Sequence, residues 1–380
     1  MLGLLRTLRA MESLELSERV RRSAVDAGAA GVGVCDAAAF TAAADAIEQR
    51  VAAGMNADMR FTFADPPRAT DIRMSFPWAQ RLVVVAWSYL PAAGSPGSPE
   101  PGTGRIARFA TENHYAGLWR VLDEIAELVD AAGHQAVPIA DDNRLVDRAA
   151  AVRAGVGWWG KNTMVLAPGT GPWFLLGSVV TDAELPVSEP MARDCGTCVA
   201  CLPACPTGAL VSPGVLDARR CLAHWLQAPG VIPYELRRAV GDRIYGCDDC
   251  LDACPPGGRL LAGSTAARGR TDLLELLGSD DATLLDRYGH WYIPRRQARY
   301  LRRNALIAIG NTGGPQAAAV AAGFLSHPDW LLRAHAAWAV GELGDELAVA
   351  VLDAAGAGET HPEVRDEIGL AREVAAAGLR

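Results

Sequence analysis

The chain has 380 residues, of which 50% are hydrophobic and 21% charged, and its formal net charge is −8. This length suggests two or three domains, and the acidic balance argues against a protein that binds nucleic acid over its whole surface, although it allows a local basic patch. No apolar run approaches the roughly 18 residues of a membrane helix, and the N-terminus lacks the apolar core of a secretion signal. We therefore expect a cytoplasmic protein that does not associate with membranes.

The first half of the chain predicts alternating helices and strands. Apolar residues at helical spacing predict an amphipathic helix, and short valine-rich runs predict buried strands. The predicted helices cover 17–27 and 113–131, and the predicted strands cover 31–35, 81–90 and 174–180. Proline, glycine and serine make 91–104 a loop. Up to about residue 185, this order predicts an α/β or α+β domain.

A glycine-rich stretch follows, AGVGWWGKNT at 154–163, which contains the spacing G-x-G-x-x-G. A dinucleotide-binding fingerprint must follow a strand, whereas residues 147–153 predict a helix. A phosphate-binding P-loop needs Ser or Thr directly after the lysine, where this chain has Asn162. The stretch instead favours a loop with aromatic faces, one cation and a polar pair, which suits the lining of a large flat cofactor.

The cysteines carry the most specific pattern in the chain. DCGTCVACLPACP, at 194–206, has the rhythm C-x2-C-x2-C-x3-C-P, CDDCLDACP at 247–255 supplies three more cysteines, and Cys221 stands between the two runs. In bacterial ferredoxins this rhythm binds [4Fe–4S] clusters, and its fourth cysteine ligates the other cluster of the pair. The pattern therefore predicts two clusters. Cys195, Cys198, Cys201 and Cys254 would hold the first, and Cys205, Cys221, Cys247 and Cys250 the second.

Other readings of these cysteines are less favoured. Zinc knuckles also use C-x2-C pairs, but they have no need of the full rhythm with its final proline. In a cytoplasmic protein, nine cysteines, an odd number, are a poor basis for a disulfide framework. The ninth, Cys35, lies in a predicted strand, and we expect it to be a buried packing residue.

The C-terminal third predicts helical repeats. LRRNALIAIGNTG (301–313) aligns without gaps on LRAHAAWAVGELG (332–344), and HPDW (327–330) is echoed by HPEV (361–364). Paired helices that recur at this spacing are typical of HEAT-like repeats. We expect an α/β or α+β cofactor domain over 1–189, a ferredoxin-like insert with two clusters over 190–260, and HEAT-like repeats over 261–380.

Taken together, these features resemble the epoxyqueuosine reductase family over nearly the whole chain. The resemblance is carried by AGVGWWGKNT, FLLGSVVTDAELP (174–186), the two cysteine runs, RIYGCDDC (243–250) and YLRRNALIAIGN (300–311). It implies an N-terminal domain that binds cobalamin, two [4Fe–4S] clusters and a HEAT-like tail that helps to hold tRNA. The implied reaction reduces epoxyqueuosine to queuosine at the wobble position.

The resemblance also implies partners and cofactor contacts. We expect Trp158, Lys161, Asn162 and Thr163 to help line the corrin site. Electrons would come from an external donor of the flavodoxin or ferredoxin type, and we expect the protein to be a monomer.

An aspartate about thirteen residues before A-G-x-G-W is the proton donor proposed for the family, and here that position is Asp141. An opened epoxide leaves an alkoxide, which needs a proton from a nearby acid. Asp142 is an adjacent like charge, and burial of either carboxyl would raise its pKa toward a useful range. The alternative is that one or both merely begin the following helix, where acidic residues suit the helix dipole.

A run of arginines near aromatic residues is the best candidate for contact with RNA phosphates. On an acidic protein such a local cluster stands out, although a charge run is more often a solvated helix face. The resemblance favours the RNA reading. The arginines are Arg295, Arg296, Arg299, Arg302 and Arg303.

Some positions depart from the family pattern. The family usually continues D-[ST]-x-P with a Glu three or four residues on, where this chain has Asp142, Asn143, Arg144 and then Asp147. A diverged paralogue that acts on another substrate, as in reductive dehalogenation, therefore stays open. Two further alternatives are a ferredoxin-like electron carrier without cobalamin and an RNA-binding scaffold with structural clusters.

Overall fold

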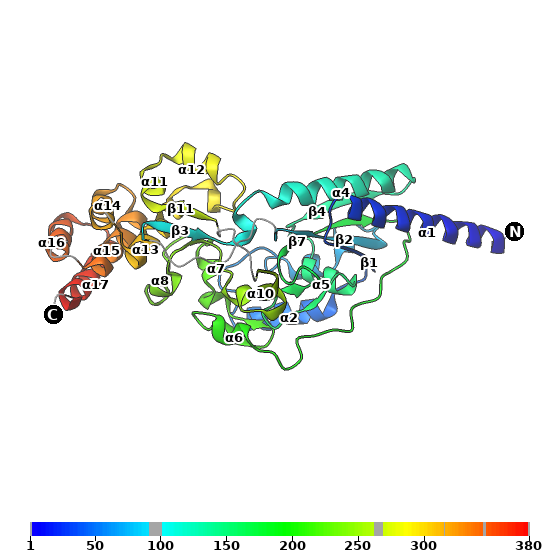
Figure 1. Ribbon diagram of the computed structural model, residues 1–380, viewed down its shortest axis with the longest axis horizontal. Helices are drawn as coiled ribbons and strands as arrows, with labels where there is room; N and C mark the ends of the chain where they lie inside the picture. Colours follow the sequence, from blue (N-terminus) through cyan, green and yellow to red (C-terminus); the bar gives the residue numbers. More distant parts are fainter. Residues whose placement is uncertain (1, 91–100, 262–268, 315, 345–346, 379–380) are drawn as a thin grey trace. The chain divides into compact units, whose positions relative to one another are not determined.

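The computed structural model describes residues 2–90, 101–261, 269–314, 316–344 and 347–378 (Figure 1). The chain forms two compact units, and each unit is assembled from three separate stretches. The first unit takes its residues from Met1–Pro91, Asn113–Arg219 and Asp249–Gly263, and the second from Ala92–Glu112, Arg220–Asp248 and Ser264–Arg380.

The first unit is built on a four-stranded sheet with the order β1-β2-β7-β4. The strands are β1 (Gly31–Asp36), β2 (Arg81–Ser88), β4 (Ala136–Ala140) and β7 (Phe174–Thr181). Three of them confirm the strands predicted over 31–35, 81–90 and 174–180. Every neighbouring pair is antiparallel, so this unit has the α+β rather than the α/β arrangement.

Helix α4 (His114–Ala131) packs on β2, β4 and β7, as the helical spacing over 113–131 predicted. Its buried stripe consists of Leu118, Val121, Leu122, Ile125, Ala126 and Val129. Gly177 on β7 permits close approach, because a Cβ there would lie 2.5 Å from Leu122 Cδ1. Helix α1 (Leu2–Asp26) packs on α4. It begins well before residue 17, so the predicted helix 17–27 is only its C-terminal part.

Shorter elements complete the first unit. They are α2 (Thr41–Ala52), α3 (Pro66–Thr70), η1 (Ile72–Met74), α5 (Asp147–Arg153), β5 (Trp158–Trp159), β6 (Val165–Leu166), α6 (Cys201–Ala204), β8 (Leu210–Ser212), β9 (Val215–Leu216), α9 (Asp249–Asp252) and α10 (Pro255–Leu261). Helix α5 packs on β2 and β7, where Ala150 and Ala151 join Leu82 and Val84 in one buried cluster.

The second unit contains a small sheet with the order β10-β3-β11. Its strands are β3 (Thr103–Ile106), β10 (Arg243–Tyr245) and β11 (Arg270–Asp272), and β3 is parallel to β10 and antiparallel to β11. The predicted loop 91–104 ends inside β3, and its residues 91–100 lie outside the described chain.

The C-terminal helices confirm the predicted repeats. Helix α13 (Arg299–Thr312) and helix α15 (Trp330–Leu343) span corresponding positions of the two aligned segments. Helix α15 packs against α13 and against α17 (Pro362–Gly378), as Figure 1 shows. The other helices and turns of this unit are η2 (Arg108–Ala110), α7 (Leu222–Trp225), α8 (Tyr234–Val240), α11 (Leu273–Gly278), α12 (Asp281–Arg287), η4 (Pro294–Arg296), α14 (Ala317–Gly323), η5 (Phe324–Ser326) and α16 (Ala348–Gly358).

A glycine sets the distance between two of the repeat helices. A Cβ at Gly341 on α15 would lie 2.8 Å from the Cα and the carbonyl oxygen of Ala371 on α17. These are backbone atoms, which cannot rotate away as a flexible side chain can.

Across the described ranges, no helix is both long enough and apolar enough to cross a membrane.

We expect Gly341→Ala to destabilise the second unit by about 1–3 kcal/mol, because the added methyl overpacks the α15–α17 contact. Gly369 on α17 is the matched control, since a Cβ there would meet nothing within 4 Å. Gly369→Ala should be neutral or stabilise by up to about 1 kcal/mol through its higher helix propensity. Thermal unfolding of the two variants checks this, and equal melting temperatures would contradict the packing argument.

Candidate active site and cluster ligands

The first predicted set of cysteines comes together in the first unit. Cys195 and Cys198 lie before α6, Cys201 begins α6, and Cys254 immediately precedes α10. Helices α6 and α9 contact each other, which brings the two cysteine runs side by side. Burial, followed by the neighbouring thiols of Cys195, Cys201 and Cys198, raises the pKa of Cys254 to about 11. The four sulfurs therefore lie within electrostatic reach of one another.

The second predicted set is divided between the units. Cys205 and Cys250 belong to the first unit, and Cys221 and Cys247 to the second. The Cys205 sulfur accepts a hydrogen bond from the Ala209 N–H at 3.2 Å. Burial acts to raise the pKa of this thiol, but hydrogen bonds from Leu210, Thr207 and Ala209 outweigh it, so the pKa is lowered. Stabilisation of the thiolate in this way suits a metal ligand.

The remaining cysteine has a different environment. Cys35 on β1 is 1% exposed, and burial raises the pKa of its thiol to about 12, as expected of a packing residue. Over the ranges that the structure describes, no three His, Cys, Asp or Glu side chains surround a point suited to a single metal ion. A [4Fe–4S] cube instead takes one thiolate at each of its four irons.

The glycine stretch forms a β-hairpin from β5 and β6. Gly160 is needed for this turn, because a Cβ there would lie 2.9 Å from the Met164 carbonyl oxygen. Gly155 has a φ of +68°, a value that favours glycine. The spacing G-x-G-x-x-G thus arises here from the closing of a hairpin, which agrees with the rejection of a dinucleotide site.

Two residues of this hairpin reach the first cysteine set. The Lys161 ammonium donates to the Gly196 carbonyl oxygen at 2.6 Å, between Cys195 and Cys198. Trp158 is buried and packs with Leu166 and Cys254. The sequence placed both residues in a cofactor lining, and nothing in it indicated their contacts with the cysteine loop.

The hairpin also holds buried donors that lack acceptors. Within the described chain, Trp158 Nε1 and Asn162 Nδ2 are buried without a hydrogen-bond partner. Asn162 Oδ1 accepts from the Met164 N–H, and Thr163 has a φ of +68°. A buried donor without a partner costs about 1–3 kcal/mol. A group that satisfied these donors would need to present acceptor oxygens or nitrogens.

Three carboxyls lie close together where β4 runs into α5. Asp141 follows β4 with a φ of +51° and stays exposed at the surface. The protein around it removes part of its water, which raises the pKa of its carboxyl, and the charge of Asp142 adds to this rise. The Arg144 guanidinium donates to both oxygens of Asp142, at 2.9 and 3.0 Å from Nε, and holds the pKa of that carboxyl below its usual value.

Asp147, the first residue of α5, is a carboxyl that the sequence analysis did not assign to the site. The residue is half-buried, but its Oδ1 is shielded from solvent and has no hydrogen-bond partner in the described chain. Burial, followed by the charge of Asp141, raises the pKa of Asp147 to about 8. The only sequence signal that could have assigned Asp147 to the site is its position, where the family usually has Glu. This carboxyl is therefore mostly protonated at neutral pH.

The predicted RNA-binding arginines have different environments within the second unit. Arg295 and Arg296 are exposed in η4. Arg299 Nη2 donates to Asp329 Oδ1 at 2.7 Å, and Arg302 Nη2 donates to the Ser279 carbonyl oxygen at 2.7 Å.

Arg303 lies in the protein interior. It is 0% exposed, and its guanidinium donates to the carbonyl oxygens of Ala228, Gly230 and Trp225 at 2.6–2.9 Å. Burial lowers the pKa of Arg303 to about 9. The expected phosphate contact at this position is wrong, because the guanidinium is enclosed by the protein.

Two family matches agree with this architecture. Residues 194–257 match the 4Fe-4S double cluster binding domain, and residues 293–371 match the HEAT repeats. The first match includes all eight cysteines predicted to bind clusters, and the second includes α13 and α15.

Relatives match over most of the chain. The epoxyqueuosine reductase of Vibrio cholerae is 33% identical over 315 residues, which cover 79% of this chain and 85% of that protein. A crystal structure of epoxyqueuosine reductase with an epoxyqueuosine-modified tRNA-Tyr stem loop is 27% identical, with a TM-score of 0.86 over 95% of this chain and 99% of that one. The Bacillus subtilis epoxyqueuosine reductase, with an aspartate-bearing catalytic loop swung out of its active site, is 26% identical with a TM-score of 0.84 over the same shares.

The raised pKa of Asp147 predicts a pH-dependent stability. Its carboxyl titrates near 3.8 when unfolded and near 8 when folded, so its stabilising effect is complete below about pH 4 and is lost as the pH rises through 8. The melting temperature of Asp147→Asn, measured relative to that of the native chain, should therefore rise as the pH is raised from 5.5 to 8.5. Asp123→Asn, on the exposed face of α4, is the control and should show no such gain. A constant difference between Asp147→Asn and the native chain across this range would contradict the assignment.

Proposed function

The chain belongs to the epoxyqueuosine reductase family, and from this membership we propose that it reduces epoxyqueuosine to queuosine in tRNA, with Asp141 as the proton donor. It is accordingly an oxidoreductase that contains iron–sulfur clusters. The RNA substrate is supported by the related structure that holds a modified tRNA stem loop.

One chain of contacts carries this proposal. It joins the segment that bears Asp141, Asp142 and Asp147, here called the carboxyl loop, to the cysteines within a single unit. Arg148, next to Asp147, donates to the Thr163 carbonyl oxygen at 3.4 Å. Two residues earlier in the hairpin, Lys161 donates to the Gly196 carbonyl oxygen at 2.6 Å. An acid and a set of thiols are thus connected through the hairpin, which is an arrangement that suits a reductive reaction supplied with protons.

The residues present fit the implied cofactors. Four converging thiols in the first unit suit one [4Fe–4S] cluster, and we assign the second to Cys205, Cys221, Cys247 and Cys250. The buried donors Trp158 Nε1 and Asn162 Nδ2 suit a ligand rich in amide oxygens, as cobalamin is, and we assign Thr163 and Lys161 to the same neighbourhood. When bound, cobalamin supplies a low-valent cobalt that is a strong nucleophile toward an epoxide.

The chain's own contribution is the management of protons. Conversion of an epoxide to an alkene takes two electrons and two protons and releases the oxygen as water. Asp141, exposed and with a raised pKa, gives the first proton to the oxygen as the C–O bond opens. Asp142 stays ionised because Arg144 holds it. Neighbouring carboxyls with pKa values pushed apart in this way are typical of acid–base sites.

The Bacillus subtilis relative gives independent support for this loop. Its catalytic loop bears an aspartate and is swung out of the active site, so the loop has two positions in that protein. Asp141 follows β4 with a left-handed φ of +51°, a conformation that costs a non-glycine residue of order 1–3 kcal/mol and is often found at functional sites.

We also propose a domain division, an electron donor, an oligomeric state and a set of RNA contacts. The division into 1–189, 190–260 and 261–380 is supported by the family matches at 194–257 and 293–371. A donor of the flavodoxin or ferredoxin type would deliver electrons, and the protein would act as a monomer. Arg295, Arg296, Arg299 and Arg302 are the RNA contacts that remain after the correction of Arg303.

Metal content tests the cofactor assignment. We expect about eight irons and one cobalt per chain after anaerobic reconstitution with cobalamin, measured by elemental analysis and EPR. Cys254→Ser should lose about half of the iron, whereas Cys35→Ser should keep it. Eight irons without cobalt would overturn the cobalamin mechanism and leave an electron carrier.

Turnover tests the role of Asp141. Asp141→Asn should lower the rate of queuosine formation by about 10²–10⁴, the usual contribution of a general acid, while metal content and tRNA affinity stay unchanged. Asp123→Asn serves as the control and should keep full activity. If Asp141→Asn also kept full activity, another group would be the proton donor. If the native, metal-loaded enzyme bound cobalamin but left epoxyqueuosine unchanged, the paralogue alternative would hold.

A further inference from the structure

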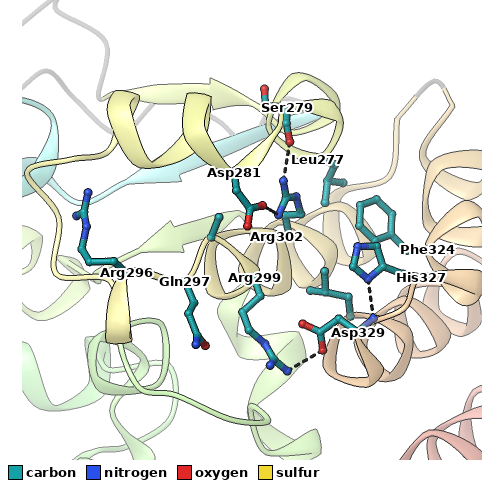
Figure 2. Close-up of a pocket in the computed structure, with 12 residues that line it drawn as sticks. Leu277, Ser279, Asp281, Arg296, Gln297, Arg299, Arg302, Phe324, His327 and Asp329 are labelled. Carbon is teal, nitrogen blue, oxygen red and sulfur yellow. Dashed lines mark hydrogen bonds and ion pairs between the residues drawn. The ribbon is translucent and has the colours of Figure 1, made fainter.

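A pocket of about 580 Å³ opens in the second unit. Its lining residues, from Leu277 to Leu332, lie far along the chain from the carboxyl loop. The pocket lies among α11, α12, η4, α13, η5 and the start of α15, and its volume falls in the usual range for small-molecule sites, roughly 300–1,000 Å³. Figure 2 shows Arg296 and Gln297 at one end of the group, and Phe324 with His327 at the other. Leu277 and Leu332 add apolar surface.

The basic side chains of this pocket are fixed by ion pairs. Arg299 pairs with Asp329, and Arg302 pairs with Asp281, as Figure 2 shows. The three lining arginines outnumber the two lining aspartates, so the pocket carries a net positive charge. Arg299 Nε is buried and has no hydrogen-bond partner within the described chain. This fixed donor matches an anionic oxygen, since guanidinium groups bind phosphate through such N–H bonds.

The opposite wall is aromatic and carries a second donor. His327 and Phe324 stack with their ring centroids 5.5 Å apart and their planes inclined by 14°. The His327 Nδ1 accepts a hydrogen bond from the Asp329 N–H at 3.0 Å. The proton of the neutral ring is therefore on Nε2. This wall offers a flat face together with an N–H group, whereas the arginine end offers positive charge.

The turn at the arginine end has an unusual backbone. Arg295 and Arg296 have φ values of +51° and +53°, in the left-handed region that non-glycine residues seldom adopt. Such conformations cost of order 1–3 kcal/mol each and cluster at ligand-binding sites. The Arg296 guanidinium donates to the carbonyl oxygens of Gly289 and Leu285 at 3.1 and 3.0 Å, which holds it at the pocket wall.

We propose that this pocket receives one unpaired nucleotide of the RNA substrate, with its phosphate at Arg296 and Arg299 and its base against the Phe324–His327 wall. The proposal rests on the tRNA reductase function proposed above and adds a specific contact to it. Proteins recognise single-stranded RNA by stacking splayed bases on aromatic side chains and by hydrogen bonds to their edges. A phosphate alone would fill only a small part of 580 Å³ and would leave the aromatic wall without a role.

The decisive variant adds a negative charge to the pocket without removing a contact. Gln297 lines the pocket and is exposed. In the described part of the chain, its side chain has no hydrogen bond to another residue. Gln297→Glu is therefore compatible with the fold and should repel a phosphate. Gln316→Glu makes the same change at an exposed position of the same unit that does not line the pocket.

The first readout is the binding of uridine 5′-monophosphate and of inorganic phosphate to the full-length protein, measured by NMR. The nucleotide should bind more tightly than phosphate. Gln297→Glu should weaken nucleotide binding about tenfold, a difference of about 1.4 kcal/mol, and Gln316→Glu should leave it unchanged. Phe324→Leu, which keeps an apolar side chain but removes the ring, should lower the affinity for the nucleotide and not for phosphate.

The second readout is affinity for an anticodon stem-loop RNA, measured by fluorescence anisotropy at fixed salt. Gln297→Glu should weaken it about as much as it weakens nucleotide binding, relative to Gln316→Glu. Equal binding of nucleotide and phosphate, or equal RNA affinity of the two glutamate variants, would overturn the pocket assignment. Loss of queuosine formation in the native protein with the nucleotide pattern intact would instead overturn the reductase function alone.

Discussion

A buried guanidinium holds the second unit together. Arg303 on α13 donates to three carbonyl oxygens, those of Trp225 at the end of α7 and of Ala228 and Gly230 before α8. The side chain of its neighbour Asn304 donates to the carbonyl oxygens of Leu226 and Ile244. Both side chains are 0% exposed. Removal of either would strand several buried acceptors, each of which costs of order 1–3 kcal/mol. The cysteine-bearing stretch 220–248 is thus fixed to the first repeat helix by hydrogen bonds that tolerate little variation.

The first unit depends on a different kind of constraint, which is the separation of charge within one short loop. Arg144 keeps Asp142 ionised, whereas Asp147 is shielded and mostly protonated. Asp141 lies between these two environments and remains open to a substrate. The hairpin of β5 and β6 links this loop to the cysteines through Thr163 and Lys161. The three carboxyls and the first set of cysteines therefore both contact one hairpin, through Arg148 and Lys161.

Local patterns in the sequence foretold the local features of the structure. The valine-rich runs form β1, β2 and β7, and the matched segments form α13 and α15. The cysteine rhythm is recognisable from the sequence alone. Long-range features escaped prediction. The carbonyl oxygens that enclose Arg303 come from residues 73–78 positions earlier, so nothing near it distinguishes it from its exposed neighbours. The small sheet pairs β3 with strands that lie still further away in the sequence, since Arg105 pairs with Arg243 and Arg270. Short strands of this kind lack a periodic pattern of their own.

The interleaving of the two units has a consequence for biosynthesis. The first unit needs residues up to Gly263, and the second begins at Ala92 but continues to Arg380. Neither unit can therefore be completed on the ribosome before most of the chain has been made. Contacts between residues so far apart slow folding, because a long loop must be closed before they can form. During that interval the two cysteine runs have not yet been brought side by side by the contact of α6 with α9. Shortened forms that end before the repeats would lack the partners of α7 and β10, so they are poor substitutes for the whole protein.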